Sequence, residues 1–79
     1  MIAQEKSALL TVDDLALLLK ISRDTVDRMR AAGETPVPFR VGRSLRWQRA
    51  AIEWWLANPK PNGDLMSSKE FTARYKGGK

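Results

Sequence analysis

Apolar residues recur at helical spacing in several stretches of this chain, and the first such stretch follows Thr11. In VDDLALLLK, one helix face would carry Val12, Leu15, Ala16 and Leu19. The Thr11 hydroxyl can accept hydrogen bonds from the free amides of a first helical turn, and the acidic residues that follow are favoured at that end of a helix. The pattern predicts a first helix that begins after Thr11 and buries its apolar face.

A second helix is predicted directly after the first. Ser22 is its expected cap, and the stretch SRDTVDRMRAAG reaches a natural stop at Gly33. Only Val26 and Met29 are strongly apolar, so this helix buries a narrow seam and leaves its charged residues outside. Because only a few residues separate the two helices, we expect them to cross steeply, as in a helix-turn-helix.

Alternation of apolar and polar residues replaces helical spacing in FRVGRSLRW, residues 39–47, which follows a link with two prolines. A hairpin with a three-residue loop would place Val41 opposite Leu45. Phe39 would then lie opposite Trp47, and all four apolar side chains would share one face. A two-residue loop would turn Leu45 to the other side, so the apolar pattern favours the longer loop.

The same hairpin carries a stripe of arginines, with no acidic residue between Glu34 and Glu53. In the favoured register Arg40 lies opposite Arg46 on the solvent face, where like charges destabilise a hairpin. Arg43 lies at the tip. The phosphates of a bound ligand would offset this repulsion.

A third helix is predicted from RAAIEWWLAN, and it ends where Asn58 precedes Pro59. Trp47 and Trp55 fall within the apolar pattern and are expected in the core. Trp54 lies beside that pattern, and we interpret it as a partly exposed residue or an oligomer contact.

These elements divide the chain into three parts. Residues 1–8 lack periodicity and are expected to form a flexible arm, and residues 9–58 form the folded domain. Residues 59–79 begin with Pro and Gly and end in KGGK, which predicts a flexible basic tail with one short helix at 68–76.

Composition narrows the possible functions. The 79-residue chain has no cysteine and no histidine, which excludes disulfides, thiol chemistry, a Cys/His zinc site and a histidine base. Asp13 and Asp14 are adjacent, but neighbours on a helix point about 100° apart and do not converge on one bond. We therefore expect no enzyme, no metal and no cofactor. The net charge of +5 favours a polyanionic partner.

The hydropathy of the chain predicts a cytoplasmic protein without a membrane partner. No apolar run approaches the roughly 18 residues that a membrane span needs. The first ten residues also lack the basic start and small-residue cleavage site of a signal peptide.

The order of these elements from residue 9 to residue 57 resembles the excisionase and MerR-like winged helix-turn-helix domains, including small prophage regulators of the AlpA type. The resemblance rests on LTVDDLALLL, on ISRDTV, on RVGRSLRW after a proline-rich link, and on a helix ending in WL. It implies a mainly α fold with a small β-hairpin, namely a winged helix-turn-helix.

The resemblance also implies which residues contact duplex DNA. Residues 22–32 correspond to a recognition helix that enters the major groove, and residues 39–47 correspond to a wing whose tip approaches the minor groove. The implied DNA-binding residues are Ser22, Arg23, Thr25, Arg28, Arg40, Arg43, Ser44 and Arg46.

Two positions depart from the family pattern. Lys20 stands where many members have a glycine, so the turn between the helices either avoids the left-handed conformation or tolerates strain. Asp27 stands where an aromatic or neutral residue is common. Its carboxylate is repelled by DNA unless it meets a cytosine amino group or pairs with a neighbour such as Arg23 or Arg30.

The function that the resemblance implies is that of an excisionase. Such a protein binds adjacent DNA sites, bends the DNA and directs a partner integrase, of the tyrosine or serine type, toward excision. We expect a monomer that self-associates on DNA. Two alternatives remain: a prophage transcriptional regulator of the same fold, and a protein-binding adaptor that uses Leu17, Trp54 and the tail.

Overall fold

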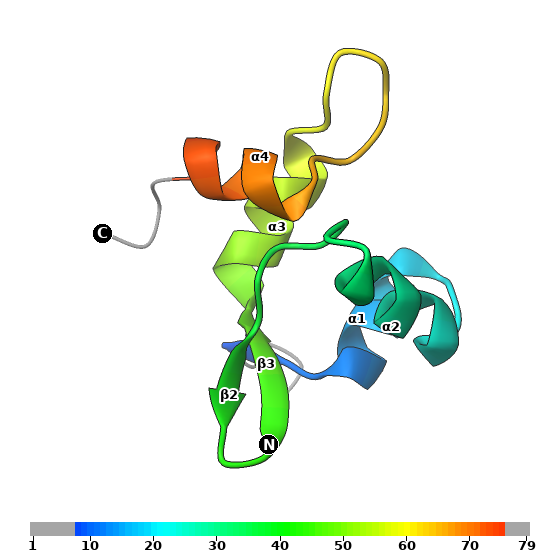
Figure 1. The fold of residues 1–79 in the computed structure, drawn as a ribbon, viewed down its shortest axis with the longest axis vertical. Coiled ribbons are helices and arrows are strands. Elements are labelled where there is room, and N and C mark those ends of the chain that lie inside the picture. The colour runs from blue at the N-terminus through cyan, green and yellow to red at the C-terminus, as the bar shows by residue number, and fades with distance from the viewer. Residues whose placement is uncertain (1–7, 76–79) are drawn as a thin grey trace.

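The computed structural model describes residues 8–75 and shows a mainly helical fold with a small three-stranded antiparallel sheet (Figure 1). The elements in chain order are β1 (Leu9–Leu10), α1 (Val12–Leu19), α2 (Arg23–Ala31), β2 (Phe39–Val41), β3 (Ser44–Gln48), α3 (Arg49–Ala57) and α4 (Ser68–Arg74). Helices α1 and α2 form a helix-turn-helix, and β2 and β3 form a wing. The predicted winged helix-turn-helix is therefore confirmed.

Strand β1 was not predicted from the sequence. It pairs with β3, with Leu10 opposite Trp47, so the strand order is β1-β3-β2. The arm expected at residues 1–8 lies outside the described residues apart from Ala8, whose carbonyl accepts the Arg49 amide at 2.8 Å. The start of the domain is thus joined to the start of α3.

Capping residues fix where the two helices of the helix-turn-helix begin. Thr11 and Asp14 form a reciprocal capping box at the start of α1, with both hydrogen bonds at 3.0 Å. Ser22 caps α2 by accepting the Thr25 amide at 3.1 Å. Between the helices Lys20 adopts the left-handed conformation, with φ 60° and ψ 42°. The turn therefore tolerates the strain, at a cost of about 1 kcal/mol for a residue with a Cβ atom.

The core lies between the helix-turn-helix, β3 and α3, and two tryptophans fill its centre. Trp47 and Trp55 are 1% and 0% exposed, as predicted. The indole N–H of Trp47 donates to the Pro36 carbonyl at 2.8 Å, and that of Trp55 donates to the Met66 carbonyl at 2.9 Å. Each tryptophan therefore fixes a loop as well as filling space.

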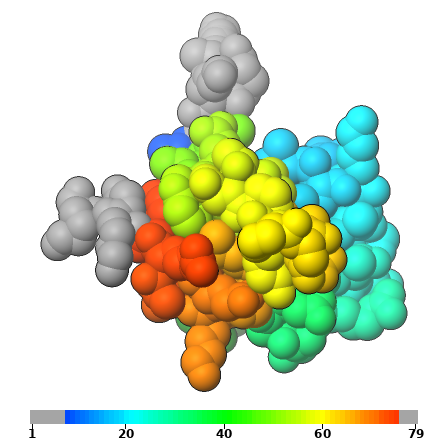
Figure 2. Space-filling model, turned by 90° about the horizontal axis from the view of Figure 1, so that it is seen from above, coloured from blue at the N-terminus to red at the C-terminus, as the bar shows by residue number. Residues whose placement is uncertain are grey.

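Residues 59–75, which we call the C-terminal segment, contribute two side chains to this core, while the loop at residues 61–64 is exposed. Met66 and Phe71 are 5% and 8% exposed. The ring of Trp54 lies 5.7 Å from that of Phe71 and 5.2 Å from that of Tyr75. Helix α4 lies within the range predicted for a short helix, and it packs beside α3 (Figure 2). The part of the expected tail that the structure describes is thus packed against α3, because its few apolar side chains contact the tryptophans of that helix.

The register of the wing differs by one residue from the predicted one. The pairs are Phe39 with Arg46, Arg40 with Leu45, and Val41 with Ser44. The loop has two residues and begins with Gly42 at φ 64°, a conformation that suits a tight hairpin turn. The prediction from the apolar pattern was wrong because the turn sets the register, and it leaves Phe39 and Val41 at 41% and 50% exposed.

This register also removes the predicted repulsive pair. Arg40 and Arg46 do not face each other: Arg40 lies on the face of Leu45, and Arg46 lies on the opposite face beside Phe39. The wing therefore spreads its arginines over both faces and the tip, and relief of a like-charge pair cannot be the reason for binding phosphate.

Candidate nucleic-acid interface

A cleft of about 470 Å³ lies between the helix-turn-helix and the wing. Arginines outnumber aspartates four to two along it. We call this the arginine cleft, and its charged lining residues are Arg23, Arg30, Arg43 and Arg46, with Asp13 and Asp27.

The α2 side of the arginine cleft follows from helical spacing. Arg23, Asp27 and Arg30 lie at i, i+4 and i+7, so they share one face of α2, while Val26 holds another face in the core. Arg23 Nη1 lies 3.2 Å from Asp13 Oδ1 on α1, and Arg30 Nη2 lies 4.0 Å from Asp27 Oδ1. Asp27 thus pairs with Arg30, one of the two neighbours considered for it.

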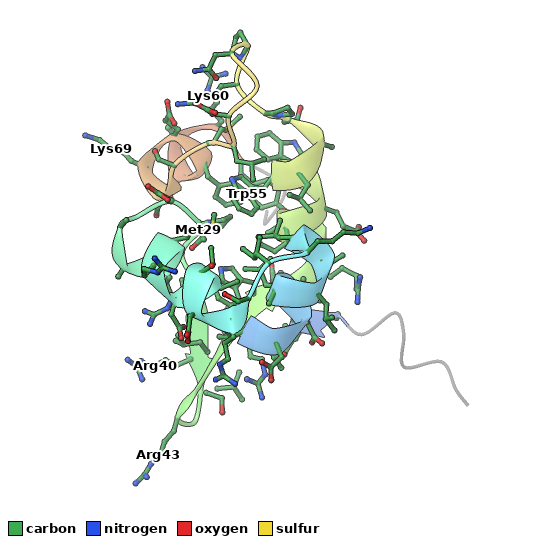
Figure 3. The ribbon with its side chains drawn as sticks, turned by 90° about the vertical axis from the view of Figure 1, so that its right-hand side faces the viewer. Met29, Arg40, Arg43, Trp55, Lys60 and Lys69 are labelled. Carbon is green, nitrogen blue, oxygen red and sulfur yellow. The ribbon has the colours of Figure 1, made fainter. Side chains whose placement is uncertain are left out.

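The wing side of the arginine cleft is supplied by the turn and by β3. Arg43 is exposed at the tip and points away from the body of the molecule (Figure 3). Arg46 donates from Nη1 to the Leu45 carbonyl at 2.9 Å. Ser44 also lines the cleft. The wing therefore presents one extended arginine and one held against its own strand.

The remaining predicted residues lie outside the cleft lining. Ser22 and Thr25 are joined at the start of α2, with their hydroxyl oxygens 2.9 Å apart. Arg28 and Arg40 are exposed, and neither has an ion-pair partner within residues 8–75. The structure thus gathers four of the eight predicted residues in one cleft, namely Arg23, Arg43, Ser44 and Arg46.

Sequence reasoning missed Arg30 and Asp13 as parts of this site. The spacing of Arg23, Asp27 and Arg30 was a usable signal, because it already places the three on one helix face. No comparable signal identifies Asp13. Its contact with Arg23 joins two helices across ten positions and depends on their crossing angle.

Basic residues also occur at the other end of the molecule. Figure 3 shows Lys60 and Lys69 at the end opposite Arg43. Lys60 Nζ lies 3.6 Å from Glu70 Oε1, so its charge is partly satisfied within the C-terminal segment. The lysines of this segment therefore do not extend the arginine cleft.

Other kinds of site were sought in the described chain. Within residues 8–75 no group of three or more metal-ligating side chains comes together. Of the helices described there, none has the length and apolar character needed to cross a membrane.

The fold and the arginine cleft define a class: a winged helix-turn-helix with a basic wing beside its second helix. A family model described as a helix-turn-helix domain matches residues 9–59. The chain therefore belongs to the helix-turn-helix domain family, a typically non-enzymatic group, and is a DNA-binding helix-turn-helix protein. A search of curated proteins found no match, and a search of solved structures found none.

Proposed function

We propose that this protein binds duplex DNA at specific sites, with α2 in the major groove and the wing at the adjacent minor groove. The observation that carries the proposal is the arginine cleft, which unites the exposed side of α2 with the wing. The major groove admits an α-helix, and the negative potential of a narrow minor groove attracts arginine. A duplex seated on both elements would meet more positive than negative charge, because four arginines and two aspartates line the cleft.

Each predicted residue has a role in this proposal. Arg28, Arg40 and Arg43 are exposed and have no ion-pair partner within residues 8–75, so binding phosphate breaks no such pair. Arg23 and Arg46 supply charge inside the cleft. Hydroxyls near these cations are suited to phosphate oxygens, and they come from Ser22, Thr25 and Ser44.

We further propose that the biological role is that of an excisionase in the cytoplasm of a host cell. The resemblance of residues 9–57 to excisionases supports this role. The small size of the domain supports it too, because one copy covers little DNA and several adjacent copies would be needed to bend it. The partner would be a tyrosine or serine integrase.

Self-association on DNA is proposed through two exposed apolar patches. One consists of Leu17 and Leu18 on α1, at 77% and 43% exposed, and the other consists of Val37, Phe39 and Val41. Helix α1 and strand β2 lie on different sides of the molecule (Figure 1). A contact between unlike patches of successive copies is heterologous and can continue along DNA.

The adaptor alternative loses support in this structure. Two of its three elements, Trp54 and the C-terminal segment, pack against each other and are used by the fold. Only Leu17 is largely exposed, at 77%. A prophage transcriptional regulator differs from an excisionase in its target rather than in its residues.

The test of DNA binding is its salt dependence. We expect the affinity for duplex DNA to fall as salt rises, and the Arg40→Ala, Arg43→Ala, Arg46→Ala triple variant to bind weakly. Each lost phosphate contact flattens the log-log slope by about 0.9. A matched control removes three cations from the C-terminal segment: Lys60→Ala, Lys69→Ala and Arg74→Ala. Equal losses for both triples, or salt-independent binding, would refute the proposal.

Footprinting on the mobile element of the host tests the biological role. Protection of an attachment site by the wild-type protein is the result expected for an excisionase. Protection confined to a promoter would instead assign the chain as a transcriptional regulator.

Binding to DNA with one site or several adjacent sites tests self-association. We expect Leu17→Ser and Val37→Ser to reduce cooperativity on several sites and to leave single-site affinity within about twofold. Ala73→Ser, at an exposed position of α4, is the control. Unchanged cooperativity in both variants would exclude these patches as the contact.

A further inference from the structure

The arginine cleft contains its own anions, and one of them holds the first residue of α2. Arg23 Nη1 lies 3.2 Å from Asp13 Oδ1 and 3.4 Å from Asp13 Oδ2, so one donor reaches both carboxylate oxygens. We propose that Asp13 competes with DNA for the Arg23 guanidinium and thereby lowers the affinity of the protein for duplex DNA. This inference rests on the proposed DNA-binding function.

Stability gives little reason for the Asp13 carboxylate. The two partners are 61% and 68% exposed, and an ion pair so open to water contributes little to folding. Capping does not need Asp13 either, because Asp14 and Thr11 already close the capping box of α1. Asp13 also lies in the first turn of α1, where a negative charge is favoured. That effect does not require a contact with Arg23, so the ion pair inside the cleft is better explained by its effect on a ligand.

A carboxylate and a phosphate oxygen use the same guanidinium donors. While Arg23 donates to Asp13, its donor Nη1 is engaged, and a phosphate at that position must displace the carboxylate. Asp13 would then lie in the cleft with its charge unpaired, close to a polyanion. Both effects oppose binding, and both act through the DNA backbone, so they apply to every duplex sequence.

The other acidic residue of the cleft differs in geometry. Asp27 lies 4.0 Å from Arg30, one turn along the same helix, whereas Asp13 reaches Arg23 from a different helix and at closer range. Among the arginines of the cleft, Arg23 is thus the one most fully engaged by a carboxylate. Replacing Asp13 should therefore raise the affinity for duplex DNA more than replacing Asp27.

The test compares two variants that each lose one exposed carboxylate from an ion pair, at 68% exposed for Asp13 and 61% for Glu53. Asp13→Asn removes the proposed competitor, and Glu53→Gln removes a carboxylate that pairs with Arg49 on α3, outside the cleft. We expect Asp13→Asn to bind a duplex about fivefold more tightly than wild type, and Glu53→Gln to bind within about twofold of it. Asp13→Glu keeps the carboxylate and should stay near wild type.

A second background shows whether Asp13 acts through Arg23. In Arg23→Gln, the further change Asp13→Asn should raise affinity by clearly less than it does in the wild-type background, because only the repulsion between Asp13 and the DNA is left to relieve. An equal gain in both backgrounds would show that Asp13 does not act through Arg23. If Asp13→Asn equals Glu53→Gln in the wild-type background, Asp13 is no competitor, while DNA binding still stands. If wild type shows no salt-dependent binding to duplex DNA, the proposed function fails and this inference fails with it. Circular dichroism confirms that each variant is folded.

Discussion

The wing and the C-terminal segment lie at opposite ends of the molecule and use their side chains in opposite ways. The C-terminal segment buries Met66 and Phe71, whereas the wing strand β2 leaves Phe39 and Val41 half exposed. The C-terminal segment is also tied to the end of α2, where the Ser68 amide donates to the Gly33 carbonyl at 2.8 Å. The C-terminal segment therefore contributes its apolar side chains to the core, whereas the wing leaves apolar side chains exposed to solvent.

Charge pairing differs in part between the two ends, although Lys69 and Arg74 of the C-terminal segment, like the wing arginines named below, have no ion pair within residues 8–75. In the C-terminal segment Lys60 pairs with Glu70, and Glu70 also accepts the Ser67 amide at 3.0 Å. In the wing, Arg40 and Arg43 have no ion-pair partner within residues 8–75. Charges that are paired internally stabilise a local structure, whereas unpaired arginines on a thin hairpin are available to an external anion. The comparison therefore supports the proposal that the wing end binds DNA, while the C-terminal segment stabilises the fold.

Phe71→Ala should strongly destabilise the fold through the C-terminal segment. Phe71 is 8% exposed and stacks on Tyr75 at 4.9 Å between ring centroids. Truncating a buried phenylalanine costs about 3–5 kcal/mol, and we expect this loss in the free energy of urea unfolding. Thr72→Ala, at an exposed position of the same helix, should change it by less than about 0.5 kcal/mol. A loss below about 1 kcal/mol for Phe71→Ala would show that the C-terminal segment is not part of the cooperative core.

Trp55→Phe should have a smaller effect at the same end. The substitution removes the indole N–H that donates to the Met66 carbonyl at 2.9 Å and leaves a buried acceptor unpaired. We expect a destabilisation of about 1–3 kcal/mol in the same urea experiment. DNA affinity, measured where the variant is folded, should stay near wild type. A comparable loss of affinity would mean that the two ends of the molecule are coupled.

Local signals in the sequence were sufficient for the helices and for the tryptophans of the core. Thr11 and Ser22 cap α1 and α2 as expected, because a cap depends on residues within one turn. Trp47 and Trp55 are buried as expected, because each lies within a continuous apolar pattern. These features require no knowledge of distant parts of the chain.

Features that depend on distant parts of the chain were missed or mistaken. The wing register follows the turn at Gly42, which outweighed the benefit of placing four apolar residues on one face. The pairing of Arg23 with Asp13 depends on how α1 and α2 cross. The C-terminal segment is polar along most of its length, and only its contact with Trp54 and Trp55 reveals it as part of the core.

Arg43→Ala and Lys69→Ala each remove one positive charge, from opposite ends of the molecule. Together they test whether DNA affinity depends on where the charge lies. Both side chains are exposed, and Figure 3 shows them at different ends of the molecule. We expect Arg43→Ala to weaken duplex binding about fivefold and to flatten the salt dependence by about 0.9 in log-log slope. Lys69→Ala should do neither, and both should leave the free energy of unfolding within about 0.5 kcal/mol of wild type. Equal effects on binding would mean that overall charge, rather than position, controls affinity.

The smallest effect expected concerns Glu70 and pH. The hydrogen bond from the Ser67 amide lowers the pKa of Glu70 below its ordinary value, and Lys60 adds to this shift. A carboxylate with a lower pKa in the folded state stabilises the fold above its unfolded pKa, and this stabilisation is lost as the pH falls through the folded pKa. Glu70→Gln should therefore melt below wild type at about pH 7, and the gap in melting temperature should narrow as the pH falls below the ordinary pKa of a glutamate. A gap in melting temperature that stays constant over this range would show that the charge of Glu70 has no part in holding α4.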